Sequence, residues 1–183
     1  QLAQINALGV QHKGDGSPVT KADVASEEHI LEGLEKLGLQ QPVVAEEGSS
    51  TFDVSTHKRY YLIDPLDGTK AFVEGGDDFT VNIGFIQNGI PMMGVLHSPV
   101  LHQTYYTAGR NAYYLSPDEQ ETMIEARKPS AAGMDVITNR TEDWSGRLKN
   151  YLEGHTVLST QRRSSAHKLG LIAHGKYDLY PRF

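Results

Sequence analysis

The sequence of 183 residues contains no cysteine, which excludes disulfide scaffolds, thiolate metal sites and thiol nucleophiles and suits a reducing compartment. It has no surplus of positive charge either, because 23 acidic residues outnumber 17 lysines and arginines and give a net charge of −6. Such a chain offers no basic stripe to a nucleic-acid backbone, so we expect no nucleic-acid partner. No stretch approaches the roughly 18 apolar residues of a transmembrane helix. These absences predict a cytoplasmic protein without a transmembrane segment, and they leave oligomeric state and peripheral membrane association open.

What the chain does contain is enough apolar residues, 38% of the total, for the core of one large domain or of one domain and part of another. Thr20 begins an expected helix, because Thr20 and Asp23 have the spacing of a capping box and the apolar stripe that follows ends at Gly38. Downstream, alternating strand patterns around Asn88-Gly89, a strong hairpin signal, predict an antiparallel meander.

A polar segment at residues 116–133, interrupted by two prolines and a glycine, marks the expected domain boundary. We assign residues 1–130 to an N-terminal α+β domain that binds metal and phosphate. Residues 131–183, in which strand and helix patterns alternate, begin a smaller C-terminal α/β domain. In this domain we expect a helix from Trp144 to Leu152 and a last strand from Tyr177 to Tyr180. The predicted fold class is therefore α/β (α+β).

Two predicted strands lead into acidic residues. Residues 42–45 run into Glu46-Glu47, and residues 59–63 run into Asp64. Because binding and catalytic residues gather in the loops at strand ends, these acids are candidate site residues.

Asp64 and Asp67 are separated by a proline, which fixes φ, and followed by Gly68, which permits a tight turn. This geometry can aim both carboxylates and the Leu66 carbonyl at one point, and Glu46 from the neighbouring strand end is a sensible third carboxylate. Oxygen ligands of this kind suit Mg²⁺, which keeps several waters and needs only a few carboxylates.

Gly68-Thr69-Lys70 is expected to open a helix, whose free N–H groups and positive end receive a phosphate beside the cation. A hydroxyl at Thr69 could orient a water for in-line attack on phosphorus, with Asp23 as the proton acceptor. Asp23 has a second interpretation, because the capping box explains it without catalysis, and spacing alone favours the cap.

The other motifs have structural explanations as well. Asp, Pro and Gly are turn residues for local reasons, so the segment from Asp64 to Gly68 could be an ordinary turn. Glu46-Glu47 alone is typical of a solvated loop. The eight histidines show no paired metal spacing, so we interpret them as surface or core residues.

Taken together, the motifs resemble those of one known family, the inositol monophosphatase superfamily. The runs that carry the resemblance are Glu46-Glu47, residues 61–72 and residues 79–83. Within the superfamily the chain is most similar to the CysQ-type 3'(2'),5'-bisphosphate nucleotidases. The features that favour this branch are residues 15–20 ahead of Asp23, Lys70 directly after Asp-Gly-Thr, and the ending at residues 178–182.

By matching position, the resemblance implies two or more Mg²⁺ ions, with lithium sensitivity, bound by Glu46, Asp64, Asp67 and the Leu66 carbonyl. It also implies that Asp23 and Thr69 activate water, which reverses the preference from spacing alone. The implied substrate contacts are Gly68, Thr69, Lys70, Ser165, Lys168 and Arg182. The family's Gly and Ser are replaced here by Ser164 and Ala166, so a local difference in that loop is expected, and Lys168 could instead be a solvated helix lysine.

The largest departure from the family is a missing motif. Its members carry one more Asp ligand in a Trp-Asp-x-Ala motif after the Tyr-Pro-Arg segment, whereas the single tryptophan here, Trp144, precedes Ser145. Because the chain also starts at Gln1 rather than at Met, we expect it to be a fragment. A truncated relative that binds without turnover is therefore an alternative to an enzyme.

The resemblance implies a layered αβαβα sandwich with an incomplete C-terminal part. The activity that it implies is removal of the 3'-phosphate from adenosine 3',5'-bisphosphate, a small nucleotide partner, to give AMP in sulfate assimilation. The alternative enzyme is an inositol or other sugar phosphate phosphatase of the same fold, although Lys70 and Tyr180-Pro181-Arg182 favour the nucleotide. A haloacid-dehalogenase-type phosphatase is disfavoured, because Leu66 stands where its second Asp would be.

Overall fold

The computed structural model of the chain describes residues 9–12, 14, 18–48, 53–140 and 146–182. The strands are β1 (Gln11–His12), β2 (Pro18–Val19), β3 (Val43–Ala45), β4 (Arg59–Asp67), β5 (Thr80–Gln87), β6 (Ile90–Ser98), β7 (Gln103–Ala108), β8 (Asn111–Leu115), β9 (Glu121–Ile124), β10 (Met134–Asn139) and β11 (Val157–Arg163). The helices are α2 (Lys21–Lys36), α3 (Thr69–Val73), α4 (Arg147–Leu152), α5 (His167–Ala173) and the 3-10 turn η1 (Val54–Thr56).

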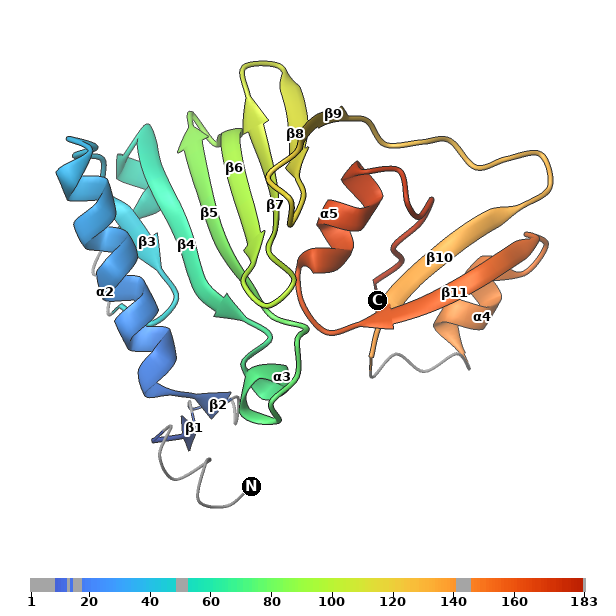
Figure 1. Ribbon diagram of the computed structural model, residues 1–183, viewed down its shortest axis with the longest axis horizontal. Helices are drawn as coiled ribbons and strands as arrows, with labels where there is room; N and C mark the ends of the chain where they lie inside the picture. Colours follow the sequence, from blue (N-terminus) through green and yellow to red (C-terminus); the bar gives the residue numbers. More distant parts are fainter. Residues whose placement is uncertain (1–8, 13, 15–17, 49–52, 141–145, 183) are drawn as a thin grey trace.

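A seven-stranded sheet in the order β3-β4-β5-β6-β7-β8-β9 dominates the described chain (Figure 1). Strands β3 and β4 are parallel, and every later neighbouring pair is antiparallel, which confirms the expected meander. The hairpin between β5 and β6 turns at Asn88 and Gly89, whose φ values of 53° and 75° are those of a two-residue turn with left-handed residues. A second sheet pairs β10 with β11 in parallel, and a short antiparallel ribbon pairs β1 with β2.

Helices cover both faces of the large sheet. On one face, Leu34 of α2 packs against Tyr61 and Ile63 in a buried cluster. On the other face, α5 lies so close to the sheet that a Cβ added at Gly170 would be 2.5 Å from the Tyr105 ring. Tyr105 belongs to the opposite face because the cross-strand register leads from it, through β6 and β5, to Asp64, the immediate neighbour of Ile63.

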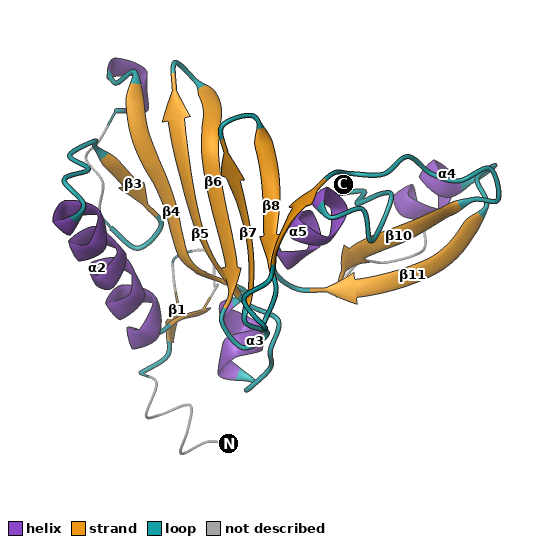
Figure 2. Cartoon of the chain, turned by 45° about the horizontal axis from the view of Figure 1, so that its top comes forward, coloured by secondary structure: helices purple, strands orange, loops and turns teal. Residues whose placement is uncertain are grey.

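The second sheet lies beyond α5, and α4 packs on its outer face (Figures 1 and 2). Val136, Leu148 and Leu152 form the buried cluster between α4 and this sheet. The order of layers is therefore helix, sheet, helix, sheet, helix, and the predicted αβαβα sandwich is confirmed. No helix in the described ranges is long and apolar enough to cross a membrane.

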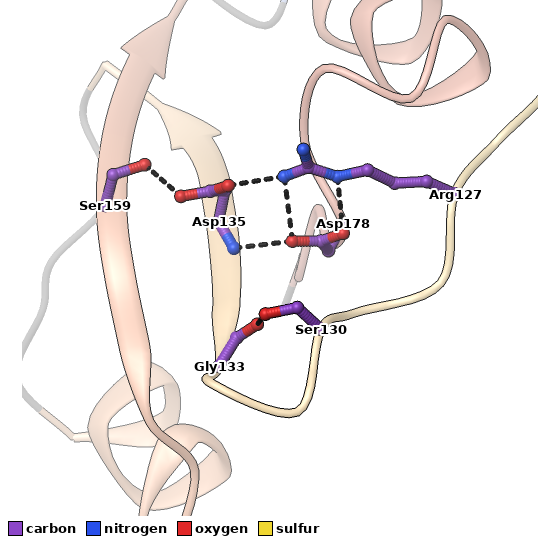
Figure 3. Close-up of polar contacts among 6 residues, drawn as sticks. All are labelled: Arg127, Ser130, Gly133, Asp135, Ser159 and Asp178. Atoms are coloured by element: carbon purple, nitrogen blue, oxygen red, sulfur yellow. Dashed lines mark hydrogen bonds and ion pairs between the residues drawn. The ribbon is translucent and has the colours of Figure 1, made fainter.

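A charged network ties the connection after β9 to the second sheet (Figure 3). Arg127 donates to both carboxylate oxygens of Asp178, at 2.7 and 3.1 Å, and also contacts Asp135. Asp178 accepts the Asp135 backbone N–H at 2.7 Å, and Ser159 donates to the Asp135 carboxylate at 2.5 Å. The chain is thus held where it leaves the large sheet and enters the second one.

Some secondary-structure elements differ from the expectation. Strand β4 does not end at Asp64 but continues to Asp67 with a break in register between these residues, where a proline can donate no ladder hydrogen bond. The polar segment 116–133 contains β9, because Ile124 is buried at the end of the sheet. The expected strand 177–180 makes only one isolated bridge, between Leu179 and Val136. Trp144, the expected helix start, lies outside the described residues.

Candidate metal and phosphate site

The segment after Ile63 is folded tightly by local contacts. The Asp64 carboxylate accepts the Leu66 backbone N–H at 3.2 Å, and Gly68 follows with a φ of 97°. A Cβ at Gly68 would lie 2.7 Å from the Asp78 carbonyl oxygen. Glycine is therefore required here by conformation and by space together. Helix α3 starts directly afterwards, at Thr69.

Glu46 reaches the same edge of the sheet because β3 runs parallel to β4. Their register places Ala45 opposite Ile63, and the Glu46 N–H donates to the Ile63 carbonyl at 3.1 Å. Glu46 and Asp64 line one hollow of about 370 Å³. From α2, the buried Glu27 accepts the N–H of Glu47 at 3.0 Å and so steadies this loop. The structure thus brings Glu46 and Asp64 together, as the sequence predicts.

Negative charge is concentrated at this edge. The pKa of Asp64 is raised to about 7, first by burial and then by repulsion from Asp67 and Glu46 and a hydrogen bond with Glu46. Burial also raises the pKa of Asp67, against the opposing effects of the Ala166 N–H and the Lys168 ammonium. Acids that repel one another in this way are relieved by a cation.

The donors suit Mg²⁺ in kind, since all are carboxylates or carbonyls. They do not form a complete cage, because no group of three or more His, Cys, Asp or Glu side chains among the described residues could hold a metal ion. One oxygen of Asp67 instead accepts the Ala166 backbone N–H, and the Leu66 carbonyl accepts the Thr69 hydroxyl at 3.1 Å. A magnesium site that uses a few of these carboxylates and several waters is compatible with the arrangement and stays a prediction.

Asp23 makes the contacts that both of its sequence interpretations require. Its Oδ2 accepts the backbone N–H and the hydroxyl of Thr20, at 2.7 and 2.6 Å, which completes the capping box of α2. Its Oδ1 faces the Thr69 hydroxyl at 3.2 Å. Only 1% of Asp23 is exposed, so its charge is held by these donors rather than by solvent. The contact between Thr69 and Asp23 is in place, while its catalytic use stays a prediction.

A second hollow, of about 280 Å³, joins the acids to the start of α5. Its lining includes three of the predicted substrate contacts. The lining residues are Asp64, Asp67, Asn139, Ser164, Ser165, Ala166, Lys168, Leu169, Tyr180 and Arg182. The other three predicted contacts, Gly68, Thr69 and Lys70, are not among them, because they lie at the start of α3, where Lys70 is exposed.

Lys168 is not a solvated helix lysine, since only 3% of it is exposed. Its ammonium donates to the carbonyls of Ser165 and Arg163, at 2.6 and 3.2 Å, and lies 5.3 Å from the centre of the Tyr180 ring. Burial lowers the pKa of Lys168, while the charges of Asp67 and Asp78 oppose that shift. A positive charge is thus buried beside the negative cluster.

Sequence reasoning missed four residues at this site: Asp78, Asn82, Asn139 and Tyr180. Tyr180, quoted only as part of the ending, donates its hydroxyl to Asn139 at 2.8 Å in the wall of the hollow. Asp78 binds the loop of Ser164 and Ser165 from a distance of 86 residues in sequence. No spacing rule links positions so far apart, so the sequence held no signal for this contact.

Asn82 was quoted only within a motif run. It pairs with Asp64 across the strands β4 and β5, and its Oδ1 is buried without a hydrogen-bond partner in the described part of the chain. The pairing of β4 with β5 follows from the predicted meander. The position of Asn82 beside the acids could have been inferred from that pairing.

Comparison with known proteins identifies the family of the chain. Residues 1–183 match the inositol monophosphatase family. The chain is 40% identical over 174 residues to the 3'(2'),5'-bisphosphate nucleotidase CysQ of Salmonella typhimurium, covering 93% of this chain and 68% of that protein. It is 38% identical over 179 residues to the protein of the same name from Escherichia coli K12, covering 96% and 70%.

Solved structures agree. The crystal structure of CysQ from Bacteroides thetaiotaomicron is similar, with a TM-score of 0.76 at 28% identity, over 99% of this chain and 74% of that one. An IMPase from Thermotoga maritima gives a TM-score of 0.77 at 24% identity, over 97% and 69%, and so shows the shared fold. From its sequence match, its layered fold and its relatives, the chain belongs to the inositol monophosphatase family.

Proposed function

We propose that this chain carries the metal and phosphate site of a Mg²⁺-dependent phosphomonoesterase. The proposed reaction removes the 3'-phosphate of adenosine 3',5'-bisphosphate and gives AMP and phosphate, in the context of sulfate assimilation. The similarity to proteins named 3'(2'),5'-bisphosphate nucleotidase supports this choice of substrate over inositol phosphates.

One observation carries the proposal: a single hollow is lined by both acids and cations. Asp64 and Asp67 form the acidic side, and Lys168 and Arg182 line the same cavity with Ser165. A substrate with two phosphates suits such a hollow, because one phosphate can lie at the metal side while the other meets the basic side chains. A monophosphate of a neutral sugar leaves the basic side without a partner.

The Thr69 hydroxyl and Asp23 supply the proton chemistry. When Thr69 donates to Asp23, at 3.2 Å, its oxygen keeps lone pairs that accept a hydrogen bond from a water. As that water attacks phosphorus, its proton can pass to Thr69 while the Thr69 proton passes to Asp23. Asp23 is prepared for this because its other oxygen is already fixed by Thr20.

Glu46, Asp64, Asp67 and the Leu66 carbonyl are the residues proposed to hold Mg²⁺. When bound, the ions would neutralise phosphate oxygens and make the attacking water more acidic. In the present arrangement Asp67 is engaged by Ala166, so ion binding is expected to compete with that contact.

Phosphate release from adenosine 3',5'-bisphosphate tests the proposal. It is measured with Mg²⁺, with EDTA and with added lithium, beside an inositol phosphate at the same concentration. We expect release from the nucleotide that needs Mg²⁺ and is inhibited by lithium. The assay uses this chain and, because relatives are longer, a form extended to their length. Equal release in EDTA, or faster turnover of the inositol phosphate by the extended form, would contradict the proposal.

A further inference from the structure

Asp78 is a buried carboxylate that the reaction just described does not use. It lies in the connection between α3 and β5, and its side chain is completely buried. One of its oxygens accepts the Ser164 backbone N–H, and the other accepts the Ser165 hydroxyl at 3.1 Å. The Ser165 oxygen in turn accepts the His167 N–H at 3.2 Å, at the start of α5. One carboxylate thus holds two consecutive residues of the loop that carries the candidate phosphate contacts.

Asp78 is itself fixed relative to the metal side of the site. Its carbonyl packs against Gly68, where a Cβ would come within 2.7 Å of the oxygen. The turn that holds Asp64 and Asp67 and the backbone of Asp78 are therefore in direct contact. Any displacement of Asp78 would move the Ser164 loop relative to the acids.

The charge of Asp78 also matters for the basic side of the hollow. It helps to keep Lys168 protonated, in opposition to the burial of that lysine. Among the described residues, the half-exposed Arg140 forms an ion pair with Asp78, at 3.8 Å. A buried carboxylate is costly unless hydrogen bonds compensate it, and here the two hydrogen-bond donors, the Ser164 N–H and the Ser165 hydroxyl, both belong to the loop.

We propose that Asp78 is a positioning residue: it holds Ser165 and Lys168 opposite the acids, in the orientation that receives a phosphate group of the substrate. This inference rests on the proposed function for the identity of the ligand, and on the contacts above for the geometry.

The test uses Asp78→Asn, whose amide has only one acceptor oxygen for two donors, and Asp77→Asn as the control. Asp77 is the exposed neighbour, 4.0 Å from Arg163. Titration calorimetry measures binding of Mg²⁺ alone and of inorganic phosphate in the presence of Mg²⁺. For Asp78→Asn we expect phosphate affinity to fall by at least about tenfold, the effect of losing one buried charged hydrogen bond, with Mg²⁺ affinity within about twofold of the original. Asp77→Asn should change neither affinity.

Hydrogen exchange supplies a readout that does not depend on any ligand. In Asp78→Asn the Ser164 amide should exchange at least about tenfold faster, while the Ala166 amide, which is bound to Asp67, keeps its rate. If Asp78→Asn does not fold, Asp78→Glu takes its place, with smaller changes of the same sign expected. Unchanged phosphate affinity, or an equal fall in phosphate and Mg²⁺ affinity, would overturn the inference.

The outcomes separate this inference from the proposed function. If the chain binds phosphate but does not prefer adenosine 3',5'-bisphosphate to AMP, the proposed substrate is contradicted. The role of Asp78 is then still tested by the phosphate affinity of Asp78→Asn. A chain that binds no phosphate contradicts the proposed function, and the exchange rate at Ser164 then decides about Asp78 alone.

Discussion

At the scale of single residues, Asp23 shows why two sequence interpretations need not compete. A carboxylate has two oxygens, and here Oδ2 caps α2 through Thr20 while Oδ1 meets Thr69. The sequence spacing of Thr20 and Asp23 reveals the cap because the two residues are close together in the chain. The contact with Thr69 spans 46 residues, so spacing could not establish it; it was suggested by the need of Thr69 for a proton acceptor and by the resemblance to a family.

Replacing Thr69 tests the proposed proton transfer. Thr69→Ala removes the hydroxyl that faces Asp23, and we expect phosphate release from adenosine 3',5'-bisphosphate to fall by about 10²–10⁴-fold. Thr69→Ser keeps the hydroxyl and should retain most of the rate. The rates are measured at saturating substrate. An alanine variant about as fast as the serine variant would show that the hydroxyl takes no part.

Replacing Thr20 separates the cap from the chemistry. Thr20→Ala removes the hydroxyl that binds both Asp23 and the Ala22 N–H. We expect the free energy of unfolding to fall by about 1 kcal/mol, as for other N-cap residues, with phosphate release within a few-fold of the original. Denaturant unfolding and the same activity assay measure the two effects. A loss of activity as large as that of Thr69→Ala would mean that the cap is part of the catalytic machinery.

At the scale of elements, the strand that carries Asp64 was predicted only in part. The apolar run before Asp64 predicted its start, because a buried strand needs such residues. Its continuation past a proline to Asp67 could not be foreseen, since it depends on pairing with Thr80 of β5 across a break in register. The sequence suggested that the start of helix α3 binds phosphate. The helix is only five residues long, so it offers a phosphate only a weak positive end.

Gly68 gives a stability prediction for this turn. Gly68→Ala places a Cβ 2.7 Å from the Asp78 oxygen at a φ of 97°, so we expect a loss of about 2–4 kcal/mol in the free energy of unfolding. Gly38→Ala is the matched control, because Gly38 has a φ of 72° but a Cβ added there would meet nothing within 4 Å beyond its chain neighbours. In the control the free energy of unfolding should fall by only about 1 kcal/mol, the cost of placing alanine in the left-handed region. Equal losses in denaturant unfolding would mean that the close approach at Gly68 is not important.

The packing of α5 on the large sheet predicts a dependence on pH. His167 is buried beside Tyr105, its Nε2 donates to Gln103 at 3.0 Å, and its burial lowers the pKa of the ring below the ordinary 6.5. The unfolded chain therefore takes up a proton that the folded chain resists. The stability due to the neutral ring is complete above pH 6.5 and is lost as the pH falls below it.

The measurement is thermal unfolding of the chain and of His167→Gln at about pH 7.5 and about pH 5.5. Because glutamine does not titrate, the variant should lose less stability on acidification than the original chain. His174, whose pKa burial also lowers, titrates in the same direction and should leave part of the dependence in place. An equal loss in both proteins would mean that His167 does not titrate in this range.

At the scale of the whole molecule, the fold could be predicted from the sequence, but the contacts that join its two sheets could not. The layered architecture followed from contiguous motifs and from their resemblance to a family. The contacts between sheets join positions far apart in sequence: Ala166 to Asp67 across 99 residues, Ser165 to Asp78 across 87, and Arg127 to Asp178 across 51. Such pairs become visible only when the chain is folded, which is why Asp78 and Asn139 were missed.

The central claim is that the acids around Asp64 bind Mg²⁺ at the edge of the large sheet. Calorimetric titration of this chain with Mg²⁺, beside Asp64→Asn, tests it most directly. We expect the chain to bind Mg²⁺ and the variant to bind it at least about tenfold more weakly, because one carboxylate is removed from a site with few protein ligands. Equal affinity in the two proteins, or no binding by either, would contradict the account.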